Sequence, residues 1–104
     1  MSKRKAIEEI ANIVGIALRH KIGAAINPDA PYAKKYMSEA ERAISEAKEK
    51  VLHINFNTED KRELEDKIKK KLQKELEQRP FIGAEKFSLI DAEIAFVLKQ
   101  LELA

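Results

Sequence analysis

Two histidines, His20 and His53, are the only side chains in this sequence of a type that titrates near neutrality. His20 sits between Arg19 and Lys21, and this electropositive setting disfavours a bound metal ion. His53 is expected at the C-terminal end of a helix, where the helix dipole favours a cation. Neither histidine has the close spacing to Glu or Asp that helical metal sites use. We therefore expect structural or solvated roles for both, with no metal and no cofactor.

Carboxylates occur in neighbouring pairs along the chain, but their surroundings argue against acid–base catalysis. A helical di-iron site needs the pattern Glu-x-x-His, and neither histidine has an acidic residue three positions before it. Most carboxylates instead have a lysine or arginine four residues away, as in Glu46–Lys50 and Glu63–Lys67, which is the spacing of ordinary surface ion pairs on a helix. The three glycines form no phosphate-binding loop, and no serine lies in a nucleophile motif. The sequence predicts no catalytic residue, and we expect a protein that is not an enzyme.

Four lysines gather on one flank of the helix expected at about 59–78, beside its leucine stripe, and they could lie along a phosphate backbone. These candidate nucleic-acid contacts are Lys67, Lys70, Lys71 and Lys74. Asp60 and Glu63 continue the same flank, and no aromatic residue interleaves with the lysines to stack on bases. A solvated surface is the favoured interpretation, and nucleic-acid binding is the alternative function.

A further candidate is the tyrosine pair Tyr32 and Tyr36, which lies one helical turn apart beside Lys34 and Lys35. The pair could grip a ligand or a partner. More often such tyrosines bury the ring and leave the hydroxyl in water, and packing is the favoured interpretation.

The composition narrows the class of protein further. Among 104 residues, 37% are charged, with 20 Lys and Arg against 18 Asp and Glu, which indicates interleaved ion pairs rather than one strong field. Lysine and glutamate dominate, a usage typical of proteins from hot environments. No cysteine occurs, so we expect a cytoplasmic protein without disulfides. The basic start, residues 1–5, resembles that of a signal peptide, but the charged residues that follow predict neither a signal peptide nor a membrane span.

Apolar periodicity predicts an all-α fold: one domain, 1–104, forming a bundle of four helices with short loops, at about 3–26, 31–52, 59–78 and 89–103. Gly15, next to Ala11 in the first helix, suggests a close helix crossing. Residues 53–57 are expected to be an extended linker that turns Ile54 and Phe56 inward.

Three helix starts are predicted from capping residues. Asp29 or Ala30 should cap the second helix before Pro31, and Thr58 should cap the third. Ser88 and Asp91 should form a capping box for the fourth. Together with the loop at 80–83, the segment 87–92 resembles the loop and capped core helix in the helical domain of glutathione transferases. The likeness is short and is chiefly a capping pattern, so we infer no activity from it.

The first and fourth helices carry more apolar residues than one buried face requires, and we expect them to supply most of the core. A helix that is apolar on two sides is either central or shared with a partner. We therefore expect a non-enzymatic protein-interaction or assembly module that self-associates through these helices, with a second copy or another helical protein as partner. The residues predicted for this interface are Ile13, Ile16, Leu89, Ala92, Phe96 and Leu103.

Overall fold

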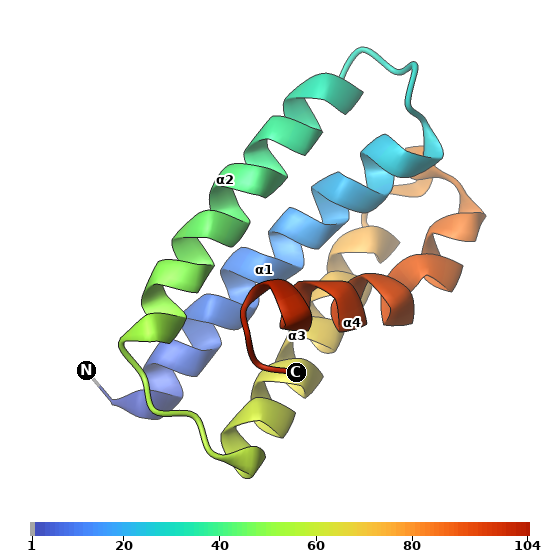
Figure 1. Cartoon of the computed structure of the whole chain (residues 1–104). Coiled ribbons are helices and arrows are strands. Elements are labelled where there is room, and N and C mark those ends of the chain that lie inside the picture. Colours follow the sequence, from blue (N-terminus) through green and yellow to red (C-terminus); the bar gives the residue numbers. More distant parts are fainter. Residues whose placement is uncertain (1) are drawn as a thin grey trace.

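The longest helix, α1 (Lys3–Ile26), is the central element of the computed structural model, which describes residues 2–104 (Figure 1). Helices α2 (Ala33–Leu52) and α3 (Thr58–Glu77) each pack extensively along α1. Helix α4 (Ile90–Gln100) runs obliquely across this layer and packs chiefly on α3. The predicted all-α bundle of four helices is confirmed for the described residues, none of which forms a strand. No helix within them combines the length and apolarity needed to cross a membrane.

The core is built around one side of α1, where apolar residues recur at helical spacing. Four α1 side chains of this row, Ile10, Val14, Leu18 and Ile22, have no exposed surface at all. The narrow stripe predicted on α3 is equally inaccessible and consists of Leu64, Ile68, Leu72 and Leu76. The buried residues within α4 are Ile90, Ile94, Val97 and Leu98. The core thus lies between α1 and all three other helices rather than mainly between α1 and α4.

Gly15 allows α1 and α3 to approach closely, as its position beside Ala11 suggested. A Cβ atom placed on Gly15 would lie 2.5 Å from Cγ and 2.9 Å from Cβ of Lys71. Both atoms belong to the part of the lysine side chain next to the backbone, so they cannot move away cheaply. The glycine therefore sets the separation of the two helices at this level.

Helix α3 begins one residue earlier than predicted, because Asn57 rather than Thr58 is its cap. The Asn57 side chain accepts a hydrogen bond from the Asp60 backbone N–H at 2.8 Å, and Asp60 Oδ2 accepts one from the Asn57 backbone N–H at 3.1 Å. This reciprocal pair is a capping box in which the two acidic or amide side chains replace Ser and Glu. The Asn57 hydrogen bond, followed by that from Lys3 at 2.9 Å, lowers the pKa of Asp60.

The predicted cap of α2 is wrong. The helix begins at Ala33 after Tyr32, and no side chain bonds to its first N–H groups. The chain reaches this point through two turns, in which Ala30 N–H donates to the Asn27 carbonyl and Ala33 N–H donates to the Ala30 carbonyl. Because these turns already bond the backbone near the helix start, Asp29 is not needed as a cap.

The predicted capping box of α4 is also wrong, because helical structure begins before it. The connection from α3 contains two short 3₁₀ helices, η1 (Pro80–Ile82) and η2 (Ala84–Leu89), and η2 runs directly into α4. Ser88 Oγ donates to the carbonyl of Glu85 at 2.7 Å instead of capping α4. The buried Lys86 anchors η2 by donating from Nζ to the Arg79 carbonyl at 2.7 Å.

Helix α4 ends earlier than predicted and folds its last residues back. Glu102 adopts a left-handed conformation with φ 61°. The Leu103 N–H then donates to the Leu98 carbonyl at 2.9 Å, and the Glu102 N–H donates to the Lys99 carbonyl at 3.0 Å. This pair of bonds is a Schellman motif, which normally brings the residue after the left-handed one against the last turn. Leu103 is accordingly buried.

Candidate functional site

Three consecutive residues, Arg19, His20 and Lys21, connect α1 to the three other helices. Successive residues of an α-helix point about 100° apart, so three in a row cover most of the circumference. Arg19 reaches Glu75 of α3, His20 reaches α2, and Lys21 reaches α4. This basic tripeptide therefore contacts all three of the other helices.

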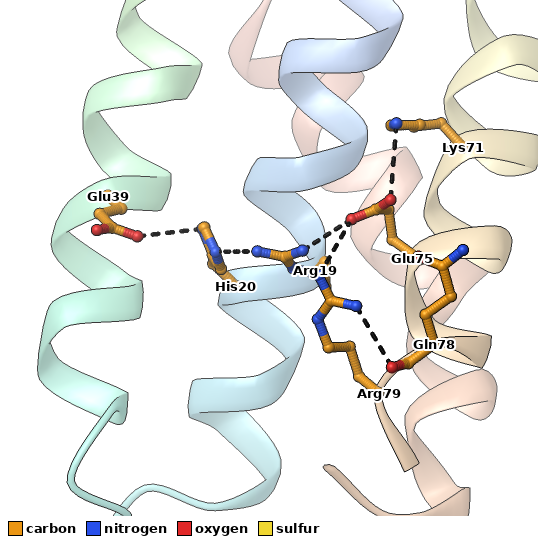
Figure 2. A network of polar contacts seen from close by, with 7 residues as sticks. All are labelled: Arg19, His20, Glu39, Lys71, Glu75, Gln78 and Arg79. Carbon is orange, nitrogen blue, oxygen red and sulfur yellow. Dashed lines mark hydrogen bonds and ion pairs between the residues drawn. The ribbon is translucent and has the colours of Figure 1, made fainter. Parts of the chain in front are cut away.

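On the side of α1 that faces α2 and α3, these contacts form a continuous network (Figure 2). We call it the polar cluster, and its members are Arg19, His20, Glu39, Lys71, Glu75 and Arg79. Arg19 donates from a guanidinium nitrogen to Glu75 Oε1 at 2.7 Å, and each of these two side chains is only 12% exposed. The same carboxylate lies 3.6 Å from Lys71 Nζ and 3.8 Å from a guanidinium nitrogen of Arg79. One acidic group thus compensates three cations.

The geometry around His20 favours the neutral imidazole. A guanidinium nitrogen of Arg19 contacts His20 Nε2. Because a guanidinium can only donate, Nε2 must be the unprotonated acceptor, and the ring proton then lies on Nδ1. Nδ1 faces Glu39 Oε2 at 3.6 Å. Burial, followed by the positive charge of Arg19, lowers the pKa of His20 against the opposing influence of Glu39.

The polar cluster offers little to a substrate, because its charges are bonded to one another. His53, the other histidine, is exposed at the C-terminal end of α2 and is not a member of the cluster. Among the described residues it has no carboxylate partner. Within residues 2–104, no group of three His, Cys, Asp or Glu side chains could hold a metal ion. We assign no catalytic or cofactor-binding residue, and the non-enzymatic interpretation stays a prediction.

The four lysines predicted to contact nucleic acid do not share one environment on α3. Lys71 packs its stem against Gly15 and pairs with Glu75, so its charge is already compensated. Lys67 and Lys70 line a shallow hollow in which acidic side chains alternate with basic ones; its other lining residues are Glu59, Arg62, Glu63 and Asp66. Lys74 is exposed. Nucleic-acid binding by Lys67, Lys70, Lys71 and Lys74 stays a prediction that this mixed surface does not favour.

The residues predicted for an oligomer interface do not form one surface. Ile13 is half-buried and packs against the core, and Leu89 does the same. Ile16 is half-buried on α1, about 140° around the helix from Lys21, which faces α4. Leu103 is in the core because the chain reverses at Glu102. Only Ala92 and Phe96 of the predicted set are exposed.

These two residues belong to an exposed face of α4 that we call the α4 outer face. It consists of Ala92, Ala95, Phe96 and Lys99. Phe96 is 52% exposed, and Lys21 Nζ lies 4.1 Å from the centre of its ring while also pairing with Glu93 at 2.9 Å. Ala95 and Lys99 were missed in the sequence, although their spacing of three and seven residues from Ala92 is the ordinary signal of a shared helix face.

The structure also brings together a row of aromatic rings that sequence spacing did not reveal. Tyr32 and Tyr36 stack at 4.6 Å between ring centres, and the predicted packing of this pair is seen. The row continues from Tyr36 to the His20 ring at 4.5 Å and from Tyr32 to Phe81 at 5.7 Å. Four rings from three separate segments thus form one row in space, and the ring at its end, Phe81, is 56% exposed.

Comparison of the chain with protein-family models, with curated proteins and with solved structures found no match.

Proposed function

We propose that this chain is a protein-interaction or assembly module that associates with a second copy of itself through the α4 outer face. The observation that carries the proposal is the half-exposed Phe96 on a helix face that also carries Ala92 and Ala95. Alanine side chains let a second helix approach closely, and an exposed aromatic ring in such a setting is typical of an interface anchor.

The charges that border this face are arranged for an antiparallel pairing. Asp91 and Lys99 each lie four residues from Ala95, on opposite sides of it. If a two-fold axis passes at Ala95, Asp91 of one copy comes next to Lys99 of the other, and the same pair forms twice. Asp91 is 85% exposed even though it pairs with Lys69 at 3.2 Å, so it can still reach a second copy.

The size of the face sets the expected affinity. Helix α4 has 11 residues and is therefore about 16 Å long. A stable protein interface buries about 800 Å² on each partner, which is more than one face of so short a helix can supply. We therefore expect a weak dimer, with a dissociation constant in the micromolar range or above.

The test is sedimentation equilibrium over a wide concentration series. The wild type should rise from the monomer mass of 11.9 kDa toward twice that value, and Phe96→Ser should stay monomeric. Phe81→Ser, which removes another exposed ring outside α4, is the matched control and should dimerise normally. Asp91→Lys and Lys99→Asp should each weaken the dimer, and the double exchange should restore it. A wild type that remains monomeric at every concentration would contradict the proposal.

A further inference from the structure

A second surface lies in the connection between α1 and α2, away from the α4 outer face in the sequence. A hollow of about 470 Å³ opens there, lined by Ile26, Asn27, Pro28, Asp29, Ala30, Tyr32 and Phe81. Its lining comes from the end of α1, the α1–α2 connection and η1, so residues more than fifty positions apart in sequence meet at it.

Two aromatic rings form adjoining walls of the hollow. Tyr32 and Phe81 have ring centres 5.7 Å apart and planes inclined at 78°. Tyr36 packs on Tyr32 at 4.6 Å, which supports that ring from within the molecule. Phe81 has no such cover and is 56% exposed. The hollow therefore presents aromatic surface to solvent from two directions.

The side chain of Asn27 holds these walls in place. Its Nδ2 donates to Tyr32 Oη and to the Ile82 carbonyl, each at 3.0 Å. The first bond fixes the tyrosine ring and the second fixes the backbone next to Phe81. A site whose walls are already held together loses less conformational freedom when a ligand binds.

The charge of the hollow is negative. Asp29 is the one charged residue among its lining residues, and no basic side chain of residues 2–104 lies within 4.0 Å of its carboxylate. The nearest lysines in sequence, Lys34 and Lys35, line a different hollow at the start of α2. Aromatic faces also carry negative charge density, so the rings and the carboxylate both attract a cation.

We propose that this hollow binds the side chain of an arginine presented by a partner protein. A guanidinium is planar and weakly hydrated, so it can stack on an aromatic ring while it donates two hydrogen bonds to one carboxylate. Phe81 and Asp29 both line this hollow, and their ring and carboxylate are the two groups that such a guanidinium would use. A lysine ammonium is more strongly hydrated and cannot stack, so it fits the same site less well.

The test uses three capped single-residue probes, the amides of N-acetyl-arginine, N-acetyl-lysine and N-acetyl-citrulline, titrated into the full chain and followed by amide chemical shifts. Citrulline has nearly the shape of arginine without its charge. Arginine should give saturable shifts centred on Asp29, Tyr32 and Phe81 with a dissociation constant in the millimolar range. Lysine should bind at least several-fold more weakly, and citrulline should give no saturable shift.

Variants separate the site from a general attraction of cations. Phe81→Ala and Asp29→Asn should each abolish the arginine response, and a retained spectrum elsewhere will show that the chain is still folded. Phe96→Ser, which disrupts the α4 outer face, should leave arginine binding unchanged, so the two proposals fail or survive separately. Equal shifts from arginine and citrulline, or an arginine response that survives both substitutions in the hollow, would overturn the proposal.

Discussion

Helix α1 holds the molecule together by different physics on its two sides. On the core side, Val14, Leu18 and Ile22 have no exposed surface and belong to the apolar core. On the other side, Arg19 and His20 belong to the polar cluster, in which charges compensate one another across three helices. Apolar burial is non-directional and tolerates sliding, whereas hydrogen bonds and ion pairs require particular atoms to meet.

This difference suggests a division of roles. The core side supplies most of the free energy of folding, in proportion to the apolar area that it removes from water. The polar cluster supplies less, because the desolvation of its charges offsets much of their attraction. We infer that the cluster instead fixes which turn of α2 and of α3 lies beside Arg19 and His20.

The largest effect should come from the core side. Leu18→Ala should lower the free energy of unfolding by about 2 to 5 kcal/mol, since it removes a fully buried side chain and leaves a cavity. Ile16→Ala is the matched control on the same helix, because Ile16 is only half-buried, and its effect should be clearly smaller. Urea denaturation followed by circular dichroism measures both. Equal losses would mean that the two sides of α1 contribute alike and that the comparison is wrong.

The polar cluster should respond unequally to removal of its two central members. Glu75→Leu should destabilise by about 2 to 3 kcal/mol, because it leaves the part-buried Arg19 beside other cations without compensation. Arg19→Met should cost less, since Glu75 keeps Lys71 and Arg79 as partners. The same denaturation experiment on the double variant should show recovery relative to Glu75→Leu alone. If Arg19→Met proves the more damaging single change, the carboxylate is not the centre of the cluster.

The helices could be predicted from the sequence because each carries a repeated apolar pattern of its own. The leucine stripe predicted on α3 is fully buried, and the close approach at Gly15 followed from a glycine in a helix interior. Such inferences depend only on residues within one element. The predicted helix starts depended on one or two capping residues each, and three of them were misplaced because a turn, a neighbouring asparagine or a 3₁₀ helix already bonded the backbone there.

The polar cluster and the aromatic row could not be predicted in this way. Arg19 and Glu75 are 56 residues apart, and nothing in the sequence around either one names the other. The placement of Leu103 at the predicted interface failed for a related reason. It assumed that the fourth helix continues to residue 103, but the left-handed conformation of Glu102, a residue type that gives no sign of a helix end, turns Leu103 into the core.

The smallest effect, and the one most specific to the polar cluster, concerns pH. The pKa of His20 is lowered in the folded protein, mainly by burial and then by the positive charges of Arg19 and Arg79. The negative charges of Glu39 and Glu75 oppose this shift but do not cancel it. Tyr36, the remaining neighbour of the imidazole from α2, stacks on the ring at 4.5 Å. Protonation would place a hydrogen on Nε2 against a guanidinium that can only donate.

Because the folded pKa is the lower one, the unfolded chain binds more protons at pH values between the folded pKa of His20 and 6.5. The contribution of His20 to stability is therefore fully present above about pH 6.5 and is lost as the pH falls toward the folded pKa. His20→Gln, which stays neutral, should remove this loss and make denaturation midpoints between neutral and mildly acidic pH more nearly constant. His53→Gln is the matched control, because His53 is exposed and outside the cluster, and its profile should follow that of the wild type. A His20→Gln profile as steep as that of the wild type would mean that the charge pattern on this side of α1 does not disfavour a further cation.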